Sequence, residues 1–307
     1  MRNMFAKALF EMLENERKQS IDKTYLLTGD LGFSVFDKLR EAYSERIINM
    51  GVSEQNMIGV SAGMALMGKD VFVYSIIPFL LYRPFEQIRN DICYHNLKVR
   101  LVGMGANLAY ANAGATHQPF EDLRIADALP NLTILSPSDP NEVEKFMHEI
   151  NSIKGPVYMR LAKSTEQFHN MHKSIQIGKV LKLTEGDEIL IIVTGALAGI
   201  AVEATKRLNA ENKNTVEVLE VHTFKPFDYD GIVASAEGKK IIVTVEDSSG
   251  ALAEKVSSAL IGKGRQKFIS FKLPDKFTDV SGSKEYLLER YGISVSNIYK
   301  AIKNAEK

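Results

Sequence analysis

The chain has 307 residues, 45% of them hydrophobic, with 38 basic against 38 acidic side chains and a single cysteine. At about 100–200 residues per domain this length predicts two domains, and the composition excludes a disordered chain. The balanced charge gives no reason to expect nucleic acid or an anionic membrane as a partner, and one cysteine excludes a disulfide framework and a cysteine-based zinc site.

The N-terminus is amphipathic and carries acidic residues inside its apolar stretch, which a signal peptide does not. The longest apolar run is interrupted by Arg83, far short of the ~20 residues that a membrane span needs. The sequence therefore predicts a soluble, cytoplasmic protein without a membrane segment.

Short apolar, β-rich runs alternate with helical spacing in the first half of the chain. The predicted strands are 25–28, 46–50, 71–75, 99–104, 132–136 and 157–161, and the predicted helices are 4–17, 54–67, 84–95 and 139–149. This alternation predicts an α/β domain at 1–170, with a parallel sheet covered by helices on both faces.

A polar segment between 164 and 187 interrupts the pattern and predicts a linker at 171–187 with one edge strand nearby. The alternation then resumes. Strands are predicted at 189–195, 215–221, 240–246 and 267–273, and helices at about 197–208, 250–261 and 283–306. We expect a second, smaller α/β domain at 188–307.

The segment GVSEQNMIGVSAGMALMG (51–68) is the first that can carry chemistry. Ser53 stands at a predicted N-cap, and Glu54 opens a helix, where a carboxylate complements the helix dipole. The helix itself is almost free of charge, which is typical of a buried helix. Glu54 is therefore either a solvated partner of the dipole or a carboxylate in a cleft, suited to hold a proton against a ligand nitrogen.

Two further segments follow. Ile76, Phe79 and Tyr82 recur every three residues, a stripe that fits a helix core or a cofactor pocket. His117 lies in the small-residue segment GANLAYANAGATHQPFEDL (105–123), after a predicted strand, where open α/β sheets bind their ligands. A histidine there is either a surface residue or a group that transfers protons.

In this order, the segments resemble the C-terminal two-thirds of transketolase, a pyrimidine-binding domain followed by a small C-terminal domain. GVSEQNM resembles the family segment whose glutamate binds the aminopyrimidine of thiamine diphosphate, which implies this role for Glu54. The resemblance places the ring pocket at Ile76, Phe79 and Tyr82, although an aromatic residue is usual at position 76. GATHQP resembles the family's histidine motif and implies a catalytic, substrate-contacting His117.

The resemblance extends to the substrate end. GPVYMRLAKS (155–164) is similar to the strand whose basic residues meet a sugar phosphate, which implies Arg160 and Lys163. Arg2 matches a phosphate-binding arginine of the family. An internal salt bridge is the alternative for Arg160, because an arginine buried without a partner is costly.

Some positions depart from the family pattern. Gly105 and Ala113 stand where the family commonly has the histidine and aspartate that contact donor-sugar hydroxyls. Lys163 replaces the usual arginine, which removes bidentate phosphate geometry. Ketol transfer stays plausible, and whether the substrate is phosphorylated stays open.

The chain also lacks the family's glycine-aspartate-glycine motif and following asparagine, which bind the diphosphate and magnesium. The resemblance thus implies half of an active site, in the C-terminal subunit of a split transketolase. The implied assembly is a heterotetramer with a homodimeric core. Its N-terminal subunit carries the diphosphate-binding domain and most of the magnesium ligands. The implied reaction moves a two-carbon unit from a ketose to an aldose.

Two other functions stay open. The β subunit of a 2-oxo acid dehydrogenase shares this two-domain layout, and the histidine of GATHQP favours transketolase over it. A non-catalytic paralogue is the second alternative, against which the presence of both Glu54 and His117 argues.

Overall fold

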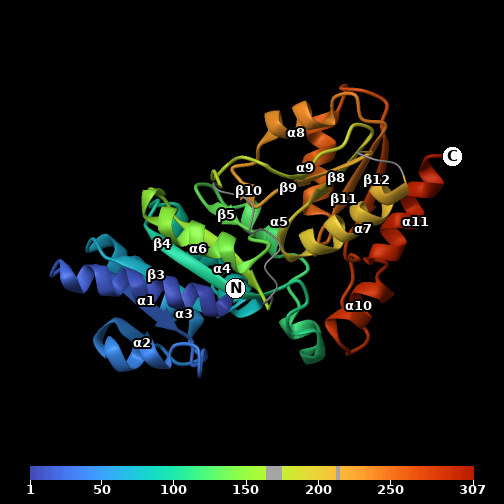
Figure 1. Cartoon of the computed structure of the whole chain (residues 1–307). Helices are drawn as coiled ribbons and strands as arrows, with labels where there is room; N and C mark the ends of the chain where they lie inside the picture. Colours follow the sequence, from blue (N-terminus) through green and yellow to red (C-terminus); the bar gives the residue numbers. More distant parts are fainter. Residues whose placement is uncertain (164–174, 212–214) are drawn as a thin grey trace.

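Two sheets organise the computed structural model, which describes residues 1–163, 175–211 and 215–307 (Figure 1). The seven-stranded sheet has the order β10-β5-β6-β4-β3-β1-β2, and the five-stranded sheet has the order β12-β11-β8-β9-β7. Neighbouring strands are parallel except β10 with β5 and β7 with β9. The predicted fold class, two α/β domains, is confirmed.

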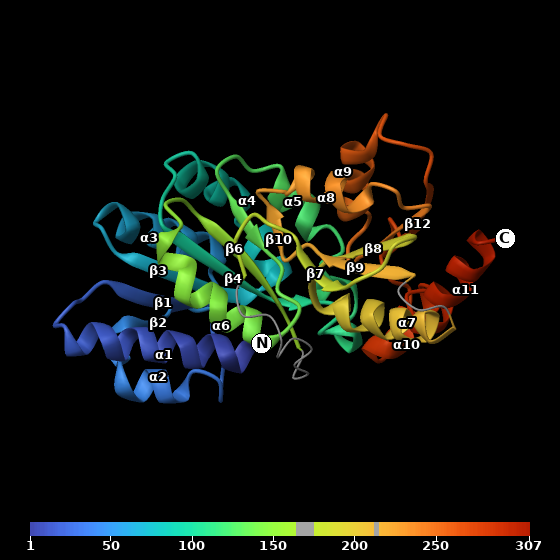
Figure 2. The same cartoon turned by 45° about the horizontal axis from the view of Figure 1, so that its top comes forward.

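The first sheet is covered on both faces. Its strands are β1 (Thr24–Thr28), β2 (Ile47–Asn49), β3 (Asp70–Ile76), β4 (Val99–Ala106), β5 (Thr133–Leu135), β6 (Val157–Ala162) and β10 (Thr223–Lys225). Around it lie α1 (Arg2–Lys18), α2 (Asp37–Ala42), α3 (Glu54–Leu66), α4 (Phe85–Gln87), α5 (Asp122–Asp127) and α6 (Pro140–Glu149), with the short helical segments η1 (Ser44–Arg46), η2 (Pro78–Tyr82), η3 (Ile88–Cys93), η4 (Ala111–Ala113), η5 (Ala115–His117) and η6 (Ile150–Ser152). Helices α1 and α6 pack against each other (Figure 2). Every residue of β4 and β6 is buried, and since side chains alternate between the faces of a strand, neither face is left to solvent.

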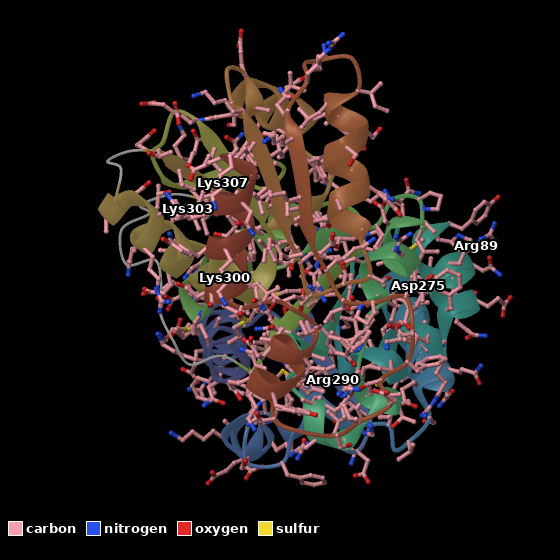
Figure 3. The ribbon with its side chains drawn as sticks, turned by 90° about the vertical axis from the view of Figure 1, so that its right-hand side faces the viewer. Arg89, Asp275, Arg290, Lys300, Lys303 and Lys307 are labelled. Atoms are coloured by element: carbon pink, nitrogen blue, oxygen red, sulfur yellow. The ribbon has the colours of Figure 1, made fainter. Side chains whose placement is uncertain are left out.

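The second sheet lies between two pairs of helices (Figure 1). It contains β7 (Leu181–Thr184), β8 (Ile189–Val193), β9 (Val216–Glu220), β11 (Ile241–Val245) and β12 (Lys267–Phe271), and its helices are η7 (Gly195–Leu197), α7 (Ala198–Glu211), α8 (Tyr229–Ala236), α9 (Ala251–Leu260), α10 (Lys284–Arg290) and α11 (Val295–Ala305). Ile298 and Ile302 of α11 are buried in the core, and Figure 3 shows Lys300 and Lys303 on the outer side of that helix. Among the helices of the described ranges, none has both the length and the apolar character that a bilayer span requires.

The predicted elements differ from the structure at a few places. The helix expected at 84–95 widens to π-helical η3 after α4, and the helix expected at 283–306 is broken at Gly292, whose φ of +77° suits glycine. Of the predicted linker, residues 171–174 lie outside the described residues, and β7 lies within the remainder. Strand β10 was not predicted, and although it follows β9 of the second sheet along the chain, it joins the first sheet beside β5.

The interface between the domains buries a pair of carboxyl groups, Glu142 of α6 and Glu220 of β9. Burial raises the pKa of Glu142 to about 7, although a hydrogen bond from the Ser138 N–H to its Oε2 (2.7 Å) opposes the rise. Burial, and next the neighbouring Glu142, raise the pKa of Glu220 well above its ordinary value. Between about pH 4.5 and pH 7 the folded chain therefore holds a proton on this pair that the unfolded chain releases.

Replacing Glu142 by glutamine is expected to raise the Tm at pH 8 and to change it little at pH 5. Because the pKa of Glu142 is raised on folding, the folded protein loses stability as the pH rises from the ordinary pKa of 4.5 to about 7. Glutamine does not titrate, so the variant avoids this loss. Calorimetric melting at both pH values measures the difference. Glu144→Gln, on the same helix but paired with Lys7 at the surface (3.0 Å), is the matched control and should shift the Tm little. A Glu142→Gln Tm below that of the wild type at pH 8 contradicts the prediction.

Candidate active site

Glu54 opens α3 at the carboxyl ends of β1 and β3, and its side chain is 2% exposed. Its Oε1 lies 3.5 Å from the place that a Cβ on Gly29 would occupy, and Ser75 Oγ lies 3.7 Å from the same place. Ser53 stands at the N-cap position, but its hydroxyl donates to the Met50 carbonyl (2.6 Å) instead of capping the helix. Glu54 is therefore a buried carboxylate rather than a solvated one, and Gly29 leaves room beside it.

Arg83 is a partner of Glu54 that the sequence did not single out. Its Nη1 donates to Glu54 Oε2 at 2.5 Å, and its guanidinium carbon lies 4.7 Å from the centre of the Phe79 ring. The Arg83 side chain is 43% exposed, so it covers the carboxylate from the solvent side. The one signal in the sequence was the interruption that Arg83 makes in an apolar run.

His117 lies next to the aromatic ring of Phe79. The two ring centres are 5.1 Å apart in an edge-to-face arrangement, and the Tyr110 ring is 6.2 Å from His117 on another side. The His117 Nδ1 lies 2.9 Å from Thr116 Oγ1. Contacts through Arg83 and Phe79 thus connect Glu54 to His117.

Tyr82 and Ile76 are placed differently. The Tyr82 hydroxyl donates to Glu121 Oε2 at 3.1 Å, and burial, with Asp122 and Glu121 nearby, raises its pKa far above the ordinary value. Ile76 ends β3, half-buried, and packs beside Gly105. Phe79 is thus the ring of the predicted pocket that the structure places between the carboxylate and His117.

Arg2 and Lys163 line a shared cavity of about 300 Å³, together with Met4, Met104 and Ala162. Arg2 opens α1, and Lys163 follows β6. Burial raises the pKa of Tyr110, and the charge of Arg2 partly offsets that rise, which places the arginine on the Tyr110 side of the site. Two of the three predicted substrate-binding cations are therefore brought together.

Arg160 is not with them, and this corrects the expectation of a substrate contact. Its side chain is 1% exposed, its Nε and Nη2 donate to Asp122 (2.8 and 3.0 Å), and its Nη1 donates to Asp247 (2.8 Å). Tyr158 also donates to Asp122 (2.7 Å). Burial by itself would lower the pKa of Arg160, but the charges of Asp122 and Asp247 hold that pKa well above its ordinary value. Arg160 therefore forms the internal ion pair that the sequence left as the alternative.

Gly105 has a φ of +134°, a backbone conformation that residues other than glycine rarely adopt. A Cβ at this position would lie 3.4 Å from the Tyr110 ring and 3.8 Å from Ile76. The ring of Tyr110 thus lies against the strand end where the family commonly has a histidine.

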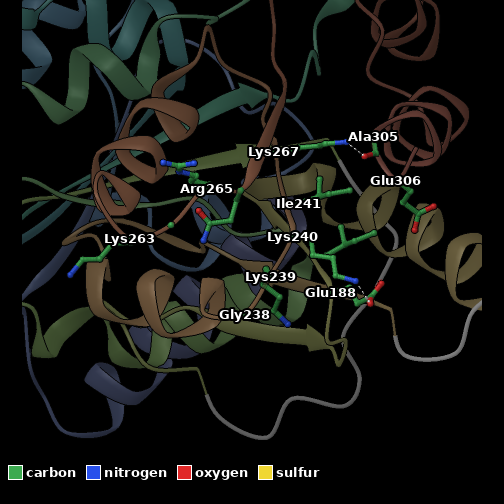
Figure 4. Close-up of a pocket in the computed structure, with 13 residues that line it drawn as sticks. Glu188, Gly238, Lys239, Lys240, Ile241, Lys263, Arg265, Lys267, Ala305 and Glu306 are labelled. Atoms are coloured by element: carbon green, nitrogen blue, oxygen red, sulfur yellow. Dashed lines mark hydrogen bonds and ion pairs between the residues drawn. The ribbon is translucent and has the colours of Figure 1, made fainter.

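A separate cavity of about 660 Å³ lies at the other end of the second sheet, where β8, β11 and β12 begin (Figure 4). Three of its cations are engaged within the protein. Lys240 pairs with Glu188 (2.5 Å), Lys239 pairs with Glu217 (2.8 Å) and Lys267 donates to the Ala305 carbonyl. This cavity is remote from the carboxyl ends that carry Glu54 and His117, so it is not part of the candidate site.

Comparison with known proteins shows the family. Residues 1–167 match the model of the transketolase pyrimidine binding domain, and residues 178–298 match that of the transketolase C-terminal domain. The chain belongs to the transketolase family.

Transketolase relatives match almost the whole chain. A putative transketolase C-terminal section of Methanocaldococcus jannaschii is 36% identical over 90% of this chain and 87% of its own length. A 6-deoxy-6-sulfo-D-fructose transketolase subunit of a Clostridium species is 31% identical over 93% and 89%. A solved structure described as a split gene transketolase, inactive beta4 tetramer, superposes with a TM-score of 0.88 at 31% identity and covers 99% of this chain and 97% of that one.

The residues present fit the pyrimidine half of thiamine diphosphate, the cofactor that the family implies. Glu54 offers a buried carboxylate, Phe79 offers a ring face, and Thr28 Oγ1 and Ser75 Oγ are buried without a hydrogen-bond partner among the described residues. The described part of the chain contains no group of three or more His, Cys, Asp or Glu that could hold a metal ion.

Proposed function

We propose that this chain is the C-terminal subunit of a split transketolase and supplies the pyrimidine half of a thiamine diphosphate site that a partner chain completes. The observation that carries the proposal is the buried Glu54 at the start of α3, which Arg83 links to the Phe79 ring, with His117 on the other side of that ring. The relatives named as a transketolase section and a transketolase subunit support it. The proposed reaction moves a two-carbon unit from a ketose to an aldose.

Each residue of the site has a role in this proposal. The bound cofactor supplies the carbon nucleophile and the electron sink for cleaving the ketose. Glu54 donates a proton to the pyrimidine ring nitrogen and holds it by a hydrogen bond. For that, Arg83 gives up its contact with Glu54 and uncovers the Phe79 ring, which its exposure to solvent permits. His117 polarises the substrate carbonyl or passes a proton to it.

Arg2 and Lys163 are proposed to bind an anionic group of the substrate. Both line the 300 Å³ cavity. A lysine is a point charge without the planar fork of arginine, so it tolerates anionic groups of different shape. We propose a sugar or a sugar phosphate as the substrate, and with a sugar phosphate these two cations would bind the phosphate.

Helix α3 supports a partner on the face turned away from Glu54, because Glu54 lies on the buried face of the helix. The helix is apolar almost all round, yet only the side with Met57, Ile58 and Ala62 is buried. Leu66 and Met67 are 67% and 81% exposed, and a Cβ on Gly63 would meet nothing within 4 Å. An apolar helix face left open is typical of a subunit interface. We propose a homodimeric core across this face, within a heterotetramer that also holds two N-terminal subunits and the magnesium.

The purified chain alone is expected to show no micromolar binding of thiamine diphosphate and Mg²⁺ by titration calorimetry, because it lacks the diphosphate half. Co-expressed with the chain that carries that half, it is expected to form a complex with two copies of each, by light scattering, and to catalyse ketol transfer. Gly63→Glu should weaken this assembly without disturbing the packing within one copy of the chain, because a Cβ at this position meets nothing within 4 Å. Micromolar binding by the free chain, or a complex that transfers no ketol unit, contradicts the proposal.

A further inference from the structure

The loop that carries Tyr110 and His117 leaves the first domain but packs into the second. Leu108, Ala111 and Phe120 are buried, and they belong to the same apolar cluster as Leu197 of η7 and Leu287 of α10. The Phe120 ring also meets the edge of Tyr291, with ring centres 6.0 Å apart. The position of His117 is therefore tied to the C-terminal domain by packing.

Hydrogen bonds from one turn hold this loop at both ends. The turn between β11 and α9 contributes Asp247, whose Oδ2 accepts the N–H of Asn107 at the start of the loop. It also contributes Ser249, whose N–H donates to the Phe120 carbonyl (2.9 Å) at the end of the loop. The other oxygen of Asp247 accepts from Arg160, which fixes the carboxylate against the first domain.

The backbone that Asp247 holds is strained. Asn107 and Leu108 have φ of +54° and +53°, in the left-handed region that residues other than glycine seldom adopt, least of all in succession. Such a conformation persists only where surrounding contacts impose it, and it is concentrated at functional sites. The bond from Asp247 to the Asn107 N–H is a contact of this kind.

We infer that the β11–α9 turn of the C-terminal domain is part of the active site, with Asp247 as a positioning residue that holds the His117 loop against Phe79. This inference rests on the proposed function only for what His117 does. The placement of the loop is a property of the free chain. The C-terminal domain thereby acts on the reaction through the loop.

The test compares the wild-type chain, without any partner, with two variants of it, Asp247→Ala and Tyr291→Leu. Amide hydrogen exchange and NMR spectra are measured for each. In Asp247→Ala, Arg160 keeps both of its bonds to Asp122, so the buried cation stays paired. The first reporters are the exchange rates of the loop amides, among them the His117 N–H, which donates to the Gly114 carbonyl (3.0 Å). The second are the chemical shifts of the His117 ring protons, which the neighbouring Phe79 ring changes by its ring current. The matched control is Asp127→Asn, which removes the ion pair between the domains with Lys255 (2.8 Å) and touches no loop residue.

Both variants are expected to speed exchange of the loop amides by about tenfold or more and to move the His117 ring signals toward those of a free histidine. The control should change neither. Exchange that is unchanged in the loop, or that rises equally along the whole chain, overturns the inference and leaves Asp247 a purely structural partner of Arg160. Because neither readout uses turnover, failure of ketol transfer would count against the proposed function and not against this positioning role.

Discussion

Replacing Glu54 by glutamine is expected to slow exchange of the thiazolium proton of bound thiamine diphosphate by about 10²–10⁴-fold in the assembled enzyme. Glutamine keeps the volume of the buried side chain, and its amide oxygen can still accept from Arg83. It has no acidic proton to share with the pyrimidine nitrogen, so the cofactor is bound but not activated. Proton exchange followed by NMR measures the effect directly, and thermal melting reports whether the fold survives.

The matched control is Glu86→Gln on α4, an exposed carboxylate that meets only Gln87 and Asn90. It should leave both the exchange rate and the melting unchanged. Wild-type exchange in Glu54→Gln would contradict the role proposed for Glu54. A large fall in Tm in the same variant would instead show that the carboxylate serves the fold at the start of α3.

Replacing Arg160 by methionine is expected to reduce the free energy of unfolding by about 3–5 kcal/mol, because it leaves Asp122 and Asp247 buried without their cation. Burial already raises the pKa of Asp122, and Arg160 opposes that rise. Without the arginine the folded state binds a proton that the unfolded chain releases, so the loss should be larger at pH 8 than at pH 5. Urea unfolding at the two pH values measures both effects.

The control for Arg160 is Arg290→Met, which breaks an exposed arginine–carboxylate pair with Asp279 (3.2 Å) and should change the free energy of unfolding little. Adding Asp122→Asn to Arg160→Met should recover part of the lost stability, since one buried charge is removed. A variant that unfolds like the wild type but has a raised KM for a phosphorylated ketose would contradict the ion-pair role and restore Arg160 to the substrate site.

The sequence by itself predicted most strands of both sheets to within a few residues, because the signals for them are local. β3 and β4 are apolar runs, and the structure buries nearly all of their residues. It did not predict the break at Gly292 or the widening of the helix at η3, since a single helical period runs through both. It also did not predict β10, a three-residue strand whose pairing with β5 of the first sheet no local pattern records.

At the site, the motifs and their resemblance to a family led to Glu54, Phe79 and His117, which the structure brings into one connected group. Only the tertiary structure showed that Arg83 covers the carboxylate and that Arg160 is internal. The partners of Arg160 lie 38 and 87 positions away along the chain, one in each domain. Helices and strands follow from residues a few positions apart, whereas the pairing of a buried charge depends on how two domains pack, which no local pattern records.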